Sequence, residues 1–191
     1  MRRAVFIGIV FAFAAGASAC GSRETPASEE KPAAAASPAP APPSVPLIAP
    51  DRLRTFLPPA ADWQQSDVKS AGIQLPAPGT HATAVYTRQN ARAELAITDT
   101  GGRQEFLEAT LTVAGTDFLQ KAANGYQKGA RIGGHPAIES WNHQDRLGEF
   151  TIVVNSRFLI YVTATGLDSI QTLRGLVDQI PFKDIESLTV K

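Results

Sequence analysis

The chain has 191 residues, 18 basic against 18 acidic side chains, and a single cysteine. This charge balance argues against a nucleic-acid partner, because phosphate binding needs a basic patch or stripe. One cysteine excludes an intramolecular disulfide and a cysteine-rich zinc or iron–sulfur site, since each needs at least two thiols. We therefore expect no nucleic-acid partner, no metal and no other cofactor.

The N-terminus has the order of regions that is typical of an export signal. Arg2 and Arg3 precede an apolar run of about 12 residues, and small residues lead from this run to Cys20. The run is shorter than the roughly 20 apolar residues that span a bilayer. We predict a signal peptide over residues 1–19. An uncleaved anchor is the alternative, because uncharged residues continue to Ser22.

The segment Ala17-Ser18-Ala19-Cys20 resembles the lipobox of bacterial lipoproteins, although Ala17 stands where that family usually has leucine. The resemblance covers the first twenty residues. It implies that the signal is cut before Cys20 and that this thiol carries a diacylglycerol, with palmitate among its acyl chains, which anchors the protein to the membrane. Gly21 is not the aspartate that retains lipoproteins at the inner membrane. In a cell with two membranes, this implies the periplasmic face of the outer membrane.

Residues 20–48 form a proline- and alanine-rich linker. Half of the 14 prolines in the chain lie there: Pro26, Pro32, Pro38, Pro40, Pro42, Pro43 and Pro46. Such a segment buries too little apolar surface to offset its ordering entropy, so we predict a disordered tether. A proline-rich recognition motif is the alternative. The remaining residues, 49–191, are enough for one independently folded core.

Hydrophobic periodicity predicts the elements of this domain. Ala93, Leu95 and Ile97 alternate with polar residues, as in a strand, whereas Leu173 and Val177 have the spacing of a helix face. In chain order the predicted elements are a helical turn over 50–57, strands near 63–69 and over 81–88 and 91–98, a helix over 103–114, strands over 136–141, 147–154 and 157–164, and a helix over 168–180. Residues 118–128 fit either a strand or a helix.

This order predicts an α+β fold, an antiparallel sheet covered by helices on at least one face. Tight turns are expected at Gln89-Asn90, Gly133-Gly134 and Asn155-Ser156. The last helix should bury Leu173 and Val177 against the sheet.

One segment resembles a catalytic loop. Asp99-Thr100-Gly101 follows an apolar strand, as in the aspartic proteases, in which two carboxylates share a proton and activate a water. The resemblance implies a dimeric hydrolase to which each chain contributes Asp99. The simpler interpretation, which we favour, is a strand end at which Asp99 turns the chain and caps the next helix.

Other polar and aromatic residues give weaker signals. His81, His135 and His143 lack the close paired spacing of a zinc site. Arg157 is expected to pair with a carboxylate across its hairpin. Four aromatic residues are candidates for a recognition surface, with packing in the core as the simpler alternative: Trp63, Tyr86, Tyr126 and Trp141.

These observations predict a non-enzymatic lipoprotein of the cell envelope. Its domain should bind an envelope protein or ligand, or assist an assembly, and no motif identifies that partner. The alternative is the aspartic-protease-like hydrolase that uses Asp99.

Overall fold

The computed structural model describes residues 45–74, 78–103 and 107–188. Cys20, the predicted signal peptide and residues 20–44 of the predicted linker lie outside the described residues. The described residues belong to a compact unit that begins at Ala41. None of their helices has the length and apolar character needed to span a membrane.

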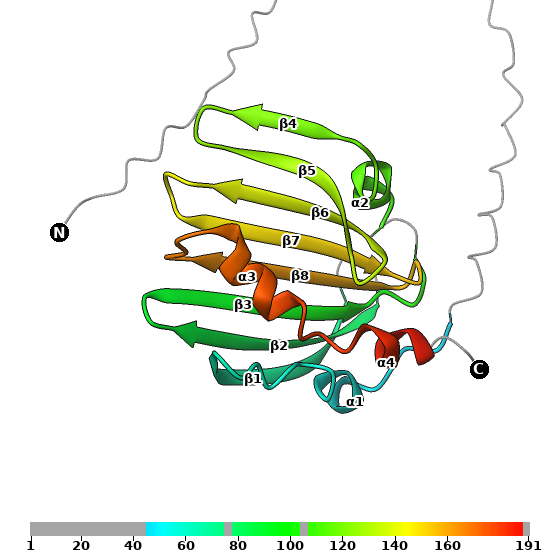
Figure 1. The fold of residues 1–191 in the computed structure, drawn as a ribbon. Coiled ribbons are helices and arrows are strands. Elements are labelled where there is room, and N and C mark those ends of the chain that lie inside the picture. The colour runs from blue at the N-terminus through cyan, green and yellow to red at the C-terminus, as the bar shows by residue number, and fades with distance from the viewer. Residues whose placement is uncertain (1–44, 75–77, 104–106, 189–191) are drawn as a thin grey trace, which may run out of the picture. The chain divides into compact units, whose positions relative to one another are not determined.

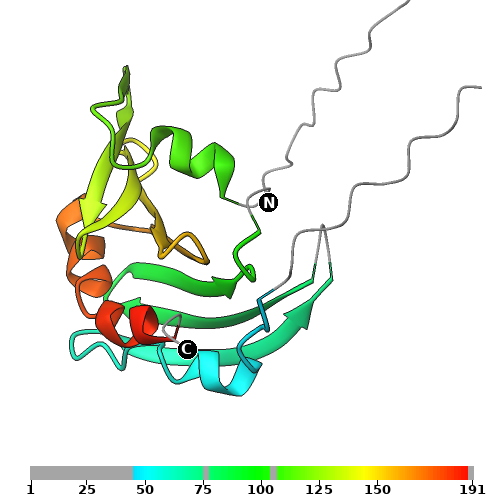
Figure 2. The ribbon, with the colours of Figure 1, turned by 90° about the vertical axis from the view of Figure 1, so that its right-hand side faces the viewer.

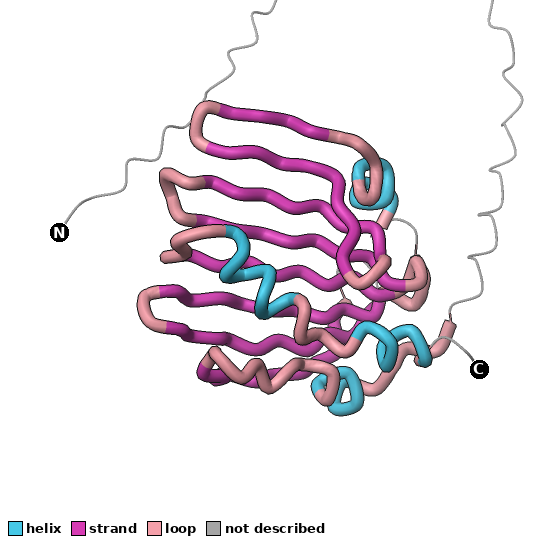
Figure 3. The backbone as a smooth tube through the Cα atoms, viewed as in Figure 1, coloured by secondary structure: helices cyan, strands magenta, loops and turns pink. Residues whose placement is uncertain are grey.

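The described residues form an antiparallel sheet and short helices (Figure 1). The strands are β1 Gln64–Ile73, β2 Gly79–Arg88, β3 Ala91–Asp99, β4 Leu119–Ala122, β5 Gly125–Ile132, β6 His135–Asn142, β7 Leu147–Val154 and β8 Phe158–Thr165. The helices are α1 Pro50–Arg54, α2 Glu108–Val113, α3 Ile170–Val177 and α4 Phe182–Ser187. The predicted α+β fold is therefore confirmed, with more of the described chain in strands than in helices (Figure 3).

The sheet has eight strands in the order β1-β2-β3-β8-β7-β6-β5-β4. Two meanders, β1 to β3 and β4 to β8, join where β3 pairs with β8. The predicted turns are present: Gln89, Asn155 and Ser156 adopt positive φ angles of 52°, 51° and 49°, as tight hairpin turns require. Residues 118–128, which the sequence left open between strand and helix, contribute to the β4–β5 hairpin.

One side of the sheet, here called the core face, carries the buried rows that include Leu95, Phe150 and Val162. Side chains of α1, α3 and α4 belong to the same hydrophobic cluster. Leu173 and Val177 of α3 are fully buried, which confirms the face predicted for this helix. The other side is here called the polar face, because it carries Gln127, Ser140 and Glu149 in register.

Helix α2 lies on the polar face, so α2 and α3 cover opposite sides of the sheet (Figure 2). A Cβ atom on Gly129 of β5 would lie 2.8 Å from the Val113 carbonyl oxygen, which shows how closely α2 approaches. The helix is shorter than the predicted range of 103–114. Gly101 and Gly102 adopt positive φ angles of 64° and 76°, so the chain turns just before the predicted helix range.

Candidate binding site

The carboxylate of Asp99 is 0% exposed, at the end of β3. It accepts hydrogen bonds from Nε and Nη2 of Arg157 at 2.8 and 2.7 Å. The amides of Gly101 and Ile48 donate to it at 2.9 and 2.8 Å. Both carboxylate oxygens are thus engaged by donors, and the charged partner bonded to Asp99 is a guanidinium. An aspartic-protease dyad instead needs a second carboxylate within hydrogen-bond distance of the first one.

Two expectations about this pair need correction. The partner of Arg157 lies on β3 and not across the β7–β8 hairpin, because β3 pairs with β8 and Asp99 lies opposite Phe158. Asp99 does turn the chain through the Gly101 amide, but it does not cap the next helix, because α2 begins at Glu108. The pairing of Asp99 with Arg157 is not readable from local sequence, since it depends on the register between distant strands.

The same pair binds the residues that precede α1. Arg157 Nη2 donates to the Pro46 carbonyl at 2.7 Å, and the Thr80 hydroxyl donates to the Ile48 carbonyl at 2.9 Å. Together with the Ile48 amide bond to Asp99, these contacts hold residues 46–48 on the sheet. Residues that the sequence assigns to the linker are therefore part of the packed structure.

The four aromatic candidates separate into two pairs. Trp63 and Tyr86 are buried in the core, and the Tyr86 hydroxyl donates to the Pro58 carbonyl at 2.8 Å. Burial raises the pKa of Tyr86 above its ordinary value. Tyr126 and Trp141 are cross-strand neighbours on β5 and β6, and both are half-buried. Only the second pair is available to a ligand.

Tyr126 and Trp141 line a hollow of about 430 Å³, here called the aromatic hollow, beside the sheet edge on the core face. Its other lining residues are Leu119, Lys121, Ala122, Gly125, Lys128 and His143. Leu119 is 53% exposed, which is high for a leucine next to aromatic rings. Lys128 Nζ lies 5.2 Å from the Tyr126 ring centre. The hollow thus combines apolar surface with positive charge.

A buried carboxylate organises the polar groups beside this hollow. Glu139 is 4% exposed, and its Oε1 accepts a hydrogen bond from the Tyr126 hydroxyl at 2.5 Å. Lys128 Nζ lies 3.0 Å and Arg174 Nη1 3.3 Å from the carboxylate oxygens. Burial, and then the bond to Glu139, raises the pKa of Tyr126. Arg174 Nε also lies 3.6 Å from Asp178 Oδ1, so these two cations face two carboxylates, and Lys121 adds a positive charge to the hollow.

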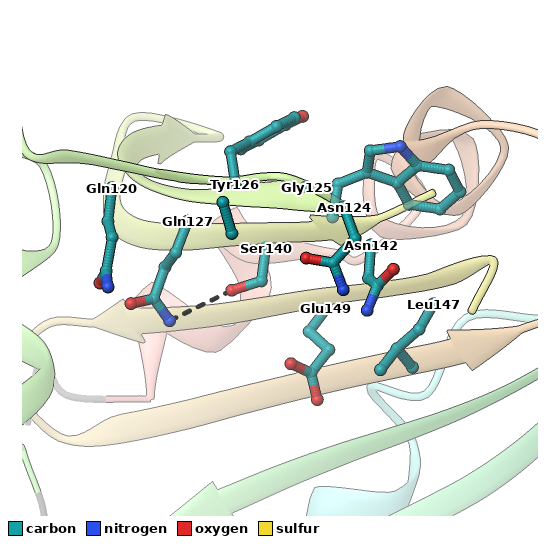
Figure 4. Close-up of a pocket in the computed structure, with 11 residues that line it drawn as sticks. Gln120, Asn124, Gly125, Tyr126, Gln127, Ser140, Asn142, Leu147 and Glu149 are labelled. Atoms are coloured by element: carbon teal, nitrogen blue, oxygen red, sulfur yellow. Dashed lines mark hydrogen bonds between the residues drawn. The ribbon is translucent and has the colours of Figure 1, made fainter. Parts of the chain in front are cut away.

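The polar face has its own hollow at the same edge, of about 360 Å³, here called the amide hollow. The register aligns Gln120, Gln127, Ser140 and Glu149 in one row across β4 to β7. Gln127 Nε2 donates to Ser140 Oγ at 3.2 Å, while Tyr126 points away from this row (Figure 4). The hollow therefore offers donors and acceptors with little charge.

The amide hollow borders a second tyrosine–carboxylate pair. The Tyr161 hydroxyl on β8 donates to Glu149 on β7. Burial, followed by this hydrogen bond, raises the pKa of Tyr161 to about 12. Glu149 is thereby held as an acceptor at one end of the row.

The two hollows share Ala122, Gly125, Tyr126 and Trp141 and lie on opposite faces of one edge. Aromatic surface with a few polar groups is the usual lining of binding sites. Among the described side chains, His, Cys, Asp and Glu form no group of three that could hold a metal ion.

The sequence pointed to Tyr126 and Trp141 but missed the rest of this site. The Asn124-Gly125 dipeptide, which is typical of tight hairpins, was the available signal for the β4–β5 hairpin that carries Leu119, Lys121 and Lys128.

Compared with protein-family models, curated proteins and solved structures, the chain matches none of them.

Proposed function

We propose that the protein is a lipoprotein of the bacterial cell envelope, anchored through an acylated Cys20, whose sheet domain binds another envelope component at the aromatic hollow. The lipobox-like segment and the proline-rich linker support the anchor and the tether. In a cell with two membranes, the proposed location is the periplasmic face of the outer membrane.

The observation that carries the binding role is the half-buried Tyr126–Trp141 pair on the sheet edge. Large aromatic side chains normally gain stability by full burial, as Trp63 and Tyr86 do in this domain. Aromatic residues that stay accessible beside a hollow are typical of the energetic centre of an interface. A partner would remove these rings and Leu119 from water.

The alternative, a dimeric hydrolase that uses Asp99, has less support. Its chemistry needs a carboxylate that can share a proton with a second carboxylate and reach water. Asp99 instead forms a buried, two-pronged ion pair with Arg157. Both oxygens of the Asp99 carboxylate already accept hydrogen bonds, from Arg157 and from the amides of Ile48 and Gly101.

Photo-cross-linking in the native cells tests the proposal. The full chain would carry a photoreactive amino acid in place of His143, at the rim of the hollow, or of Lys69, on the distant β1 edge. We expect a specific adduct from position 143 and none from position 69. Trp141→Ala should abolish this adduct. Val68→Ala, a change of an apolar residue that is 40% exposed on the distant β1 edge, should leave it intact.

Equal adducts from both positions, or an adduct at position 143 that survives Trp141→Ala, would contradict the binding site. The melting temperature of each variant shows whether the domain remains folded.

A further inference from the structure

The two edges of the sheet differ in how they meet solvent. The β1 edge is irregular: its register shifts between Ser66 and Lys69, and Asp67 adopts a φ angle of 49°. Bulges of this kind protect an edge from pairing with another strand. In β4, by contrast, four residues pair in unbroken register with β5, and all four are exposed. Within the described residues, β4 is the outermost strand and pairs with β5 alone (Figure 1).

The backbone of β4 presents free hydrogen-bonding groups to this edge. The Gly129 amide donates to the Phe118 carbonyl at 2.9 Å, so Phe118 and Gly129 form a hydrogen-bonded pair. Such pairs alternate along an antiparallel ladder. The amide and carbonyl groups of Leu119 and Lys121 therefore point away from β5, toward the open edge.

Each face of this edge has a hollow into which the side chains of an added strand would point. Successive side chains of a strand face opposite sides of a sheet. Leu119 and Lys121 border the aromatic hollow on the core face, and Gln120 borders the amide hollow on the polar face. This arrangement fits recognition by strand addition, in which backbone bonds supply affinity and alternate side chains supply specificity.

We infer that the partner at this site is a protein that adds an extended segment antiparallel to β4, with an acidic, a polar and an apolar residue in succession. The inference deepens the proposed function and rests on it. The acidic residue lies opposite Lys121, the polar residue opposite Gln120 and the apolar residue opposite Leu119. Antiparallel addition continues the pairing of the whole sheet.

The charges around the aromatic hollow favour a carboxylate in the added strand. Lys121 and Lys128 line the hollow, and Arg174 of α3 approaches from the core face. Glu139, which pairs with Lys128 and Arg174, is buried and already bonded to Tyr126. Asp178, which also pairs with Arg174, does not line the hollow. An acidic partner residue beside Lys121 therefore gains attraction without meeting an exposed negative group of this hollow.

A peptide of defined sequence tests the inference on the full chain purified in detergent. The probe is the capped nonapeptide Thr-Val-Thr-Glu-Thr-Leu-Thr-Val-Thr, and its matched control has Lys in place of Glu. We expect the Glu peptide to bind about five- to tenfold more tightly than the Lys peptide, because like charges opposed across strands are unfavourable. Binding should slow amide hydrogen exchange in β4 and leave exchange in β1 unchanged.

A variant that reverses the charge at position 121 gives the decisive test. Lys121→Glu should reverse the preference, so that the Lys peptide binds more tightly than the Glu peptide. Lys69→Glu, a matched change on the β1 edge, should leave the preference as it is. Lys121→Pro, which removes one outward amide while keeping the inward bonds of β4, should abolish the slowed exchange.

Three results would overturn the inference. The peptide could slow amide exchange in β1 instead of β4, or Lys121→Glu could leave the peptide preference unaltered. The third result is a dimer, detected by sedimentation, that pairs through β4 and does not dissociate when the peptide is added. The last result would make a second copy of this chain the occupant. If the adduct at position 143 contains no protein, strand addition fails while the proposed function stands. If position 143 gives no adduct at all, the proposed function itself fails.

Discussion

At the scale of single residues, the Asp99–Arg157 pair has the largest energetic consequences. Both side chains are buried, and each satisfies the charge of the other while binding residues 46–48. Breaking such a pair from one side leaves an uncompensated buried charge, which costs about 3 to 5 kcal/mol. This exceeds the roughly 0.5 to 2 kcal/mol that a helix cap contributes.

We therefore predict that Asp99→Ala and Arg157→Ala each lower the free energy of unfolding by about 3 to 5 kcal/mol. The double variant should lose less than the sum of the two, because neither buried charge is then left alone. Asp99→Asn should be milder than Asp99→Ala, since its amide oxygen still accepts the Gly101 bond. Urea denaturation measures all four. Strictly additive losses would contradict the direct coupling.

Tyrosine ionisation gives a second prediction at this scale. The pKa values of all three tyrosines, Tyr86, Tyr126 and Tyr161, are raised above 10.0, that of Tyr161 to about 12. The folded state thus holds its phenolic protons more tightly than the unfolded state. The associated stability is fully present below pH 10 and, for Tyr161, is lost as the pH rises toward about 12.

Near-ultraviolet absorbance of tyrosinate should therefore show little ionisation of the folded protein at pH 10, where the unfolded chain in urea is half-ionised. Glu149→Gln should lower the pKa of Tyr161, because the carboxylate beside the hydroxyl opposes its ionisation. Glu94→Gln is the matched control with a smaller effect, since Glu94 contributes least to the shift. A folded-state titration that is centred at pH 10 would refute this account.

At the scale of elements, the short segment before α1 stabilises the sheet that it enters. Its Ile48 amide and Pro46 carbonyl are partners of the buried ion pair, and its Ile48 carbonyl accepts the Thr80 bond. Removing these groups leaves buried donors and acceptors without their partners, and each such loss costs about 1 to 3 kcal/mol.

A fragment that starts at Ala49 should therefore be less stable than one that starts at Val45, by at least about 1 to 3 kcal/mol. Both fragments should unfold cooperatively and without dependence on reducing agent, because Cys20 is the only cysteine of the chain and both lack it. Thermal and urea unfolding of the two fragments measure the difference. Equal stability would show that residues 45–48 contribute nothing to the fold.

At the scale of the whole molecule, the prediction concerns the anchor. Two acyl chains on Cys20 would bind the membrane stably, because each buried methylene contributes about 0.8 kcal/mol. Cys20→Ser should therefore abolish incorporation of labelled fatty acid and release the protein from the acyl-anchored membrane fraction. Metabolic labelling followed by membrane fractionation measures both effects. Label retained by the Ser variant would exclude Cys20 as the attachment site.

Several parts of this protein follow from its sequence alone. Alternation in β3 and the apolar spacing in α3 predicted these elements and their buried faces. Residues 157–164 were predicted as the strand that is now β8, and the turn at Asn155-Ser156 predicted the β7–β8 hairpin. These features are local: a strand or an amphipathic helix exposes its pattern within its own residues. The α+β class follows from the order of such elements.

Tertiary structure alone decided which distant residues meet. The pairing of β3 with β8 places Asp99 against Arg157, 58 residues away, and the register of β5 with β6 places Tyr126 beside Trp141. The same register buries Glu139 and opens one hollow on each face of the β4 edge. A strand's pattern determines which of its faces is buried, but not which strand lies beside it. That choice depends on the packing of the whole core, and here it creates the site.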